Sequence, residues 1–490
     1  MGALGDLGVL LVDGTLRPAS GGATFTTTNP ATEEVLGEAA DGTAEDMDAA
    51  IGAARAAFDE GTWASDPAFR ARCLRQLRDA LLARTVEFRD LTTAEVGAPS
   101  FLTGGPQFVL PAEDLGWYAD LAESYDGWTT DLGEASPVGV RSQRWVWREP
   151  AGVVGAITPW NFPHQINFAK LGPALAAGCT VVLKPAPDTP WCASAVARIA
   201  AEETDLPPGV LNVVTSSDHT IGEQLAGDPR VDLVSFTGST ATGKAVMHAA
   251  ADHLTKVFLE LGGKSAFVVL EDADLASAAA MAGFSVCTHA GQGCAITTRL
   301  VVPRAKYDEA VEAAAATLGG IKPGDPNSKR TICGPVISAR QRDRIQGYLD
   351  SAIAEGGRFA CGGGRPADLD RGFFIEPTVI AGLDNSAKVS REEIFGPVLT
   401  VIAHDGDDDA VRIANDSPYG LSGTVFSGDD ARAQAVAARL RVGTVNVNGG
   451  VWYSADAPFG GYKQSGIGRE MGVAGFEEYL ETKLIATLAS

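Results

Sequence analysis

The sequence lacks the features of membrane, disulfide-rich and nucleic-acid-binding proteins. It contains no run of about 18 apolar residues, as a membrane span needs, and the apolar segment Leu7–Val12 has no basic leader typical of a signal peptide. Its seven cysteines are scattered, odd in number and without Cys-x-x-Cys spacing, which argues against a disulfide framework and a zinc site. With 39 basic and 62 acidic residues, the net charge of −23 repels nucleic acid and anionic lipid. We therefore expect a cytoplasmic protein with reduced thiols, no metal, and no nucleic-acid or membrane partner.

The chain is too long for a single hydrophobic core. Its 490 residues predict two or three domains, and 45% hydrophobic with 21% charged residues is typical of a soluble globular protein. Residues 42–98 repeat apolar positions at helical spacing, which predicts a helical N-terminal segment. Residues 127–148 change to a period of two, most clearly over Val138–Trp147, and predict an exposed β-ribbon that needs a partner.

From Gly152 onward, short β-branched runs alternate with helical stretches such as Ala193–Glu203. This order predicts a parallel sheet with helices on both faces, whose ligands bind at the carboxyl ends of the strands. The predicted strands are Val153–Ile157, Thr180–Leu183, Val210–Val214 and Val231–Phe236.

Candidate catalytic and binding residues follow three of these predicted strands. Two prolines restrict the loop that carries Asn161, so its amide is a candidate oxyanion donor, and a plain loop with an aromatic plug is the alternative. Lys184 is a candidate ligand for ribose hydroxyls or a phosphate, with a solvated lysine before a turn as the alternative. Gly238 and Ser239 lead into a helix whose N-terminus favours an anion such as pyrophosphate, although the Gly-x-Gly-x-x-Gly spacing is missing.

Two further residues are candidates for covalent catalysis. Glu260 lies in an apolar run, where burial raises the pKa of a carboxyl towards the range of a general base, and a buried salt bridge is the alternative. Cys294 follows Gly293 and precedes a small residue, so a substrate carbonyl can approach its sulfur, whereas a buried core thiol is the alternative. His289 is close to Cys294 in sequence, but no protease signature accompanies the pair, which disfavours a cysteine protease.

Together these motifs resemble the aldehyde dehydrogenase superfamily, from about Asn29 to the C-terminus. The most specific matches are Glu260–Lys264 and Gly291–Cys294. Four other segments also match the family, namely Pro159–Asn161, Phe236–Ser239, Glu392–Pro397 and Pro458–Gly466.

The resemblance implies an α/β fold with a Rossmann-like cofactor-binding domain, an α/β catalytic domain and a small β oligomerisation element. It also implies a homodimer or homotetramer, and we expect the ribbon near Val138–Trp147 to pair with the C-terminal strand of a neighbouring subunit, because its edge needs cover. The implied boundaries are 1–127 and 149–260 for the cofactor-binding domain, 261–475 for the catalytic domain, and 128–148 and 476–490 for the oligomerisation element.

By the same resemblance, the protein oxidises an aldehyde to a carboxylate with NAD as the cofactor and NADP as a second possibility. Cys294, as thiolate, forms a thiohemiacetal and then a thioester, while Asn161 holds the oxyanion. Glu260 activates the water that hydrolyses the thioester, and Lys184 completes the implied catalytic set. The alternative is a CoA-acylating semialdehyde dehydrogenase, a branch in which the residue matching Glu260 is typically not a glutamate.

The resemblance extends to the residues that contact the cofactor and the substrate. The implied substrate positions have an apolar and aromatic character that offers no charge to a carboxylate or phosphate, which favours medium-chain aliphatic or aromatic aldehydes. They are Phe162, Ile166, Trp452, Tyr453 and Phe459, with Leu110 a less secure match. The implied cofactor contacts are Ile157, Thr158, Pro159, Trp160, Lys184, Pro187, Gly238, Ser239, Thr242, Leu261, Gly262, Glu393 and Phe395.

Pro187 departs from the pattern of those relatives that prefer NAD, which have a glutamate three residues after the lysine. Proline neither accepts hydrogen bonds from the ribose nor repels a 2′-phosphate, so we predict that the protein uses both NAD and NADP. Asp188 is expected to face away, because successive side chains of an extended chain point to opposite sides.

Overall fold

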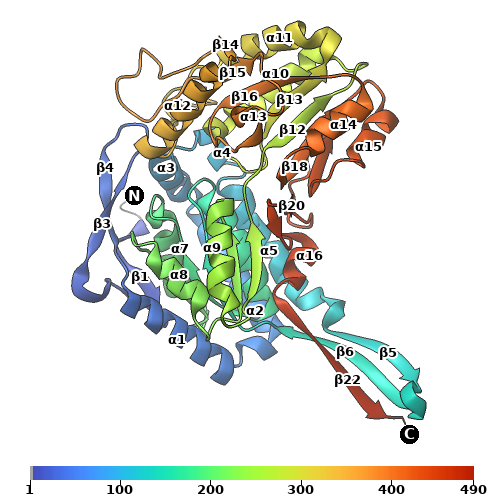
Figure 1. Ribbon diagram of the computed structural model, residues 1–490. Helices are drawn as coiled ribbons and strands as arrows, with labels where there is room; N and C mark the ends of the chain where they lie inside the picture. The colour runs from blue at the N-terminus through green and yellow to red at the C-terminus, as the bar shows by residue number, and fades with distance from the viewer. Residues whose placement is uncertain (1–3, 490) are drawn as a thin grey trace.

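Figure 1 shows the computed structural model of the protein, which describes residues 4–489. Two sheets covered by helices form the body, and a long β-arm extends from it beside the C-terminus. No helix within residues 4–489 is long and apolar enough to cross a bilayer.

The N-terminal segment is helical, as predicted for residues 42–98. It contains α1 (Ala44–Glu60), α2 (Pro67–Ala83) and α3 (Thr85–Val96), followed by α4 (Ser100–Thr103) and α5 (Val109–Ser124). Thr43 caps α1, because its Oγ1 accepts from Asp46 N at 3.3 Å while the Asp46 carboxylate accepts from Thr43 N at 2.9 Å. Gly97 ends α3 in the left-handed conformation, with φ 72°.

The first sheet positions the chemistry at the ends of its strands. Its strands are β1 (Leu10–Val12), β2 (Thr15–Arg17), β7 (Val153–Ile157), β8 (Thr180–Lys184), β9 (Leu211–Val213), β10 (Leu233–Thr237), β11 (Lys256–Glu260) and β21 (Gly466–Ile467). Helices α6 (Pro163–Ala177), α7 (Pro190–Glu203), α8 (Thr220–Gly227) and α9 (Thr240–Ala251) lie between these strands in sequence. The order is β2-β1-β9-β8-β7-β10-β11-β21, and the run from β9 to β11 is parallel. The predicted parallel sheet is confirmed, with small shifts at the strand ends.

The second sheet is also mainly parallel. Its strands are β12 (Ser265–Val269), β13 (Thr297–Pro303), β14 (Arg358–Cys361), β15 (Thr378–Ala381), β16 (Val398–His404), β18 (Ser422–Phe426) and β19 (Thr444–Val447). They follow the order β14-β15-β16-β13-β12-β18-β19, in which β14 alone pairs antiparallel. The accompanying helices are α10 (Leu275–Cys287), α11 (Tyr307–Gly320), α12 (Ala339–Ala354), α14 (Asp407–Asn415) and α15 (Asp430–Ala437).

The arm consists of β5 (Thr129–Ala135), β6 (Ser142–Pro150) and β22 (Leu480–Leu488), in the order β22-β6-β5. The C-terminal strand β22 therefore pairs with β6 of its own chain along its whole length. The prediction that the ribbon pairs with a neighbour's C-terminal strand is wrong, because both edges of β6 are already occupied within the chain. The ribbon strand also begins later than predicted, since residues 137–139 form a turn in which Val138 has φ 48°. Val138 and Leu488 leave large apolar surfaces in solvent, at 99% and 79% exposure.

Short elements complete the fold and link the two sheets. They are β3 (Thr24–Thr28), β4 (Val35–Ala40), α13 (Lys388–Arg391), β17 (Tyr419–Gly420), β20 (Tyr462–Lys463) and α16 (Gly472–Glu477). After the second sheet, the chain returns to the first, where β21 pairs antiparallel with β11 at Glu260 and Gly466. The predicted domain boundaries place β21 in the catalytic domain, and they stay a prediction.

Candidate active site

The parallel register brings the predicted loops to one edge of the first sheet. Ile157, the last residue of β7, pairs with Lys184 on one side and with Phe236 on the other. Thr237 pairs with Glu260 in the next strand. Because these residues lie at or next to the ends of their strands, the loops carrying Asn161 and Ser239 start side by side.

Three of the four predicted catalytic residues surround a common cavity between the two sheets, and the fourth, Lys184, is not among the residues that line it. Cys294, Glu260 and Asn161 all line this space, which has a volume of about 300 Å³. The five predicted substrate residues line it too, namely Phe162, Ile166, Trp452, Tyr453 and Phe459. Leu110, the less secure match, is not among the lining residues and is 40% exposed. The structure thus assembles the predicted nucleophile, base and substrate walls, and we call this space the aldehyde cavity.

Glu260 is almost fully buried, at 1% exposure. Its Oε1 has no hydrogen-bond partner within residues 4–489, and no salt bridge holds it, so the salt-bridge alternative does not apply. Burial and then the charge of Glu470 raise the pKa of the Glu260 carboxyl well above its usual value. Burial also raises the pKa of the Cys294 thiol, and the charge of the nearby Glu260 carboxyl raises it further. The nucleophile and the base therefore line the same cavity and influence each other's protonation.

Asn161 is held by three buried polar groups. Its Nδ2 donates to the carbonyl of Gln292 at 2.9 Å, and its own carbonyl accepts from Gln107 Nε2 at 2.8 Å. His289 Nε2 lies 2.9 Å from the same Asn161 carbonyl, and burial lowers the pKa of this histidine to about 4. His289 thus supports the Asn161 backbone as a neutral ring, which leaves no dyad with Cys294.

Gln292 is a supporting residue for which the sequence analysis predicted no role. It lies two residues before Cys294, is fully buried, and its Oε1 accepts from Ile337 N at 2.9 Å. Its Nε2 donates to the His289 carbonyl at 3.2 Å. The nearby Gly291 has φ 71°, and a Cβ there would lie 2.0 Å from the Gly396 carbonyl oxygen, so only glycine fits.

Glu470 is an acidic residue of the cavity that sequence reasoning missed. Its Oε1 forms a buried ion pair with Lys170 Nζ at 2.6 Å, and Lys170 also donates to Ser235 Oγ at 3.1 Å. The sequence predicts an apolar and aromatic lining, but the cavity also has acidic walls, because Glu260 and Glu470 both contribute to it. Among the described lining residues none is basic, so the expectation that the cavity offers no positive charge to a carboxylate holds.

Lys184 and Thr158 meet at the edge of the first sheet. Lys184 is 4% exposed, and its Nζ has a single long contact of 3.5 Å, to the Pro185 carbonyl. Burial lowers the pKa of Lys184 to about 8, opposed by the charges of Asp218 and Asp41. Thr158 Oγ1 is buried with no partner in the part of the chain that the structure describes. Both side chains thus have hydrogen-bonding capacity left for a ligand.

Ser239 caps helix α9 at the same edge. Its Oγ accepts from Thr242 N at 3.2 Å, so Gly238 leads directly into a capped helix N-terminus that favours an anion. In the first turn of α9, Gly243 leaves room for the Leu261 side chain, since a Cβ on Gly243 would lie 2.6 Å from Leu261 Cδ2.

Glu393 and Phe395 approach this edge from the second sheet. Glu393 Oε1 accepts from Gly263 N at 2.9 Å, and burial raises the pKa of the Glu393 carboxyl to about 7. A Cβ on Gly262 would lie 2.2 Å from Glu393 Oε2, so glycine is required for this approach. The rings of Trp160 and Phe395 are in edge contact, with 5.4 Å between centroids.

Pro187 and Asp188 lie in a turn that Thr189 N closes by donating to the Ala186 carbonyl at 3.2 Å. The expectation that Asp188 faces away rested on an extended chain, and that premise is wrong. Burial raises the pKa of Asp188, and the neighbouring Arg340 and His219 oppose this.

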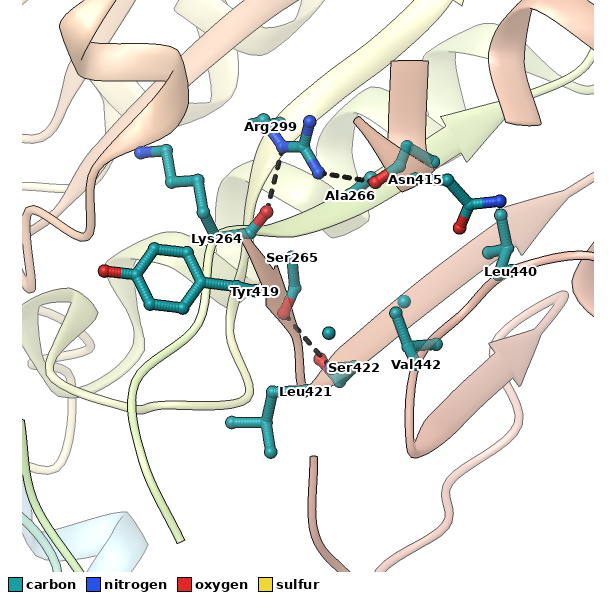
Figure 2. A pocket seen from close by; sticks show the side chains of 13 residues that line it. Lys264, Ser265, Ala266, Arg299, Asn415, Tyr419, Leu421, Ser422, Leu440 and Val442 are labelled. Carbon is teal, nitrogen blue, oxygen red and sulfur yellow. Dashed lines mark hydrogen bonds between the residues drawn. The ribbon is translucent and has the colours of Figure 1, made fainter. Parts of the chain in front are cut away.

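A separate cavity lies where β12 begins, next to β18 (Figure 2). Buried Arg299 donates there to the carbonyls of Lys264 at 2.9 Å and Ala414 at 3.0 Å. Figure 2 shows the side chains of Lys264 and Tyr419 pointing to the same side. Burial and then Arg299 lower the pKa of Lys264 to about 7, while Glu393 opposes the shift. The described walls of this cavity include none of the predicted catalytic side chains.

The fold and the cavity are those of an aldehyde-oxidising dehydrogenase, and the chain belongs to the aldehyde dehydrogenase family. The family model "Aldehyde dehydrogenase family" matches residues 17–485. Geranial dehydrogenase from Castellaniella defragrans is 43% identical over 94% of this chain and 94% of its own length. Betaine aldehyde dehydrogenase from Bacillus subtilis is 40% identical over 93% of this chain and 92% of its own length.

Solved structures agree with this assignment. An aldehyde dehydrogenase from Mycobacterium tuberculosis, complexed with NAD+, superposes with a TM-score of 0.93 at 42% identity, over 99% of this chain and 98% of its own. A cysteine-to-alanine mutant of aldehyde dehydrogenase C from Pseudomonas syringae, complexed with NAD+ and octanal, has a TM-score of 0.92 at 40% identity, over 97% and 96% of the two chains. The predicted family and fold are therefore confirmed.

Proposed function

We propose that the protein oxidises an aldehyde to the corresponding carboxylate, with Cys294 as the nucleophile. The observation that carries this proposal is the placement of Cys294, Glu260 and Asn161 around one cavity of about 300 Å³. Membership of the aldehyde dehydrogenase family supports it. The test is aldehyde-dependent formation of NADH by the purified protein, which Cys294→Ala must abolish.

The first step is attack of the Cys294 thiolate on the aldehyde carbon, which forms a carbon–sulfur bond and a thiohemiacetal oxyanion. The Asn161 side chain, steered by Gln292, and the backbone N–H of Cys294 stabilise the oxyanion. The bonds from Gln107 and His289 to the Asn161 carbonyl limit its movement, so the amide needs little reorganisation as charge develops.

The residues at the edge of the first sheet fit NAD, the cofactor with which two structural relatives were crystallised. Lys184 and Glu393 would bind the two riboses, Ser239 at the start of α9 would bind the pyrophosphate, and Phe395 would pack beside the nicotinamide. The free hydrogen-bonding capacity of Lys184 and Thr158 supports this fit. NAD supplies, when bound, the acceptor for the hydride that leaves the thiohemiacetal carbon and so yields the thioester.

Hydrolysis of the thioester is the task of Glu260. Its raised pKa makes its carboxylate a stronger base than that of an ordinary glutamate, so it can take a proton from water. The attack of this water on the thioester breaks the carbon–sulfur bond and releases the carboxylate product and the Cys294 thiolate. The presence of this glutamate beside the nucleophile supports water rather than coenzyme A as the acyl acceptor. Formation of an acyl-CoA in the presence of coenzyme A would contradict this choice.

The substrate class follows from the cavity walls. Aromatic rings form one side, where Trp452 stacks on Phe459 with 4.5 Å between centroids, and the acidic groups Glu260 and Glu470 disfavour an anionic substrate. We propose medium-chain aliphatic or aromatic aldehydes, and a panel of such aldehydes with NAD and NADP tests this.

The assembly proposed for the protein is a homodimer or homotetramer that covers the apolar residues of the arm. Sedimentation of the intact protein tests it, and a monomer would contradict it.

A further inference from the structure

A small side chamber adjoins the aldehyde cavity. The two spaces share four wall residues, which are Gln165, Ala169, Tyr453 and Met471. The remaining walls come from helices α5 and α6 and are Pro111, Asp114, Tyr118 and Phe168. Ala169 presents only a methyl group to the boundary, so no large side chain of α6 closes the chamber at that position.

Asp114 gives the chamber a negative charge that no base neutralises. Its Oδ2 accepts from Tyr453 Oη at 3.4 Å, and no lysine or arginine of residues 4–489 forms a salt bridge with it. Burial raises the pKa of Asp114 to about 6, and the nearby charges of Glu113 and Asp456 act in the same direction. The carboxyl therefore lies in a negative field, and a cation beside it would favour its ionised form.

Tyr118 adds a second polar group with unused hydrogen-bonding capacity. The residue is 1% exposed, and its Oη has no hydrogen-bond partner within the described part of the chain. A buried hydroxyl without a partner is unfavourable, so a bound molecule is expected to satisfy it. The chamber has a volume of about 10 Å³, which is room for one water molecule or one group of similar size.

We propose that this chamber binds a primary ammonium group at the end of the substrate opposite the aldehyde, so that ω-amino aldehydes are preferred. The inference rests on the proposed aldehyde oxidation. A primary ammonium has three N–H donors, and three of the residues that line the chamber carry acceptor oxygens, namely Asp114, Tyr118 and Gln165. The apolar walls of the aldehyde cavity would hold the methylene chain, while a trimethylammonium group exceeds the chamber and a carboxylate would face Asp114.

The test compares matched aldehydes that differ only at the far end. Specificity constants are measured for 3-aminopropanal against butanal and for 6-aminohexanal against heptanal, because a methyl group then replaces the ammonium. At least one amino aldehyde should exceed its partner by roughly tenfold or more, the effect of a hydrogen bond to a charged group. Asp114→Asn should bring this ratio close to one, and Tyr118→Phe, which keeps the ring, should lower it. The control is Asp120→Asn, since Asp120 is exposed on the same helix and does not line the chamber, and it should keep the ratio.

Three results would overturn the inference: no preference for either amine, an unchanged ratio in both Asp114→Asn and Tyr118→Phe, or better turnover of betaine aldehyde than of the amino aldehydes. Because the readout is a ratio within each variant, a general loss of folded enzyme does not mimic the expected result. Failure of the proposed function gives a different pattern, in which neither the amino nor the alkyl series yields NADH.

Discussion

Replacement of Glu260 by Gln separates the two halves of the proposed reaction. Gln has nearly the same shape, and Glu260 Oε1 has no partner within residues 4–489, so the change removes no hydrogen bond from that atom. Hydride transfer precedes hydrolysis, so a first turnover should still release a burst of NADH close to the enzyme concentration. Loss of a general base lowers the later steady state by about 10²–10⁴-fold. Stopped-flow NADH fluorescence measures both phases.

The same variant should carry a more acidic thiol. Burial raises the pKa of Cys294 most, and the charge of Glu260 raises it next, so a neutral amide removes the second contribution. The rate of alkylation by iodoacetamide, measured against pH, should therefore reach its midpoint at a lower pH than in the parent protein. The exposed Glu113→Gln variant is the control and should match the parent. A variant that binds NAD but gives no burst, or whose alkylation midpoint stays in place, would refute this reasoning.

Further predictions follow from the nucleophile, the cofactor edge and the arm. Cys294→Ala should abolish aldehyde oxidation while NAD still quenches the protein fluorescence, and substantial turnover would exclude the mechanism. NADP should support activity within about a hundredfold of NAD in kcat/KM, the strength of a charged hydrogen bond, and Pro187→Glu should move the ratio towards NAD. A parent protein that rejects NADP entirely would assign this discrimination to another residue. Deletion of residues 481–490 exposes the edge of β6 and should give insoluble or monomeric protein, so a soluble, active oligomer on sedimentation would contradict that role.

The features of the fold and the site that the sequence predicts depend mostly on local patterns. The parallel strands of the first sheet are short β-branched runs, and the residues ending them, such as Lys184 and Glu260, necessarily meet at one edge. What could not be predicted depends on long-range contacts. The Lys170–Glu470 pair joins residues 300 positions apart, and Gln107 reaches Asn161 from another helix-rich segment. Likewise, no local pattern reveals that β22 completes the arm of its own chain.

The remote origin of the cavity walls has a consequence for how the protein folds. Local helices form within microseconds, whereas contacts that close loops of hundreds of residues carry a larger entropic barrier and form late. The pairing of Lys170 with Glu470 belongs to the late group, because 300 residues separate the two partners. During refolding, the helical circular dichroism should recover before the NADH burst does. A molecule halted between these events would have native-like secondary structure and no activity. The recovery of the NADH burst, which requires Cys294, therefore reports when the two sheets dock.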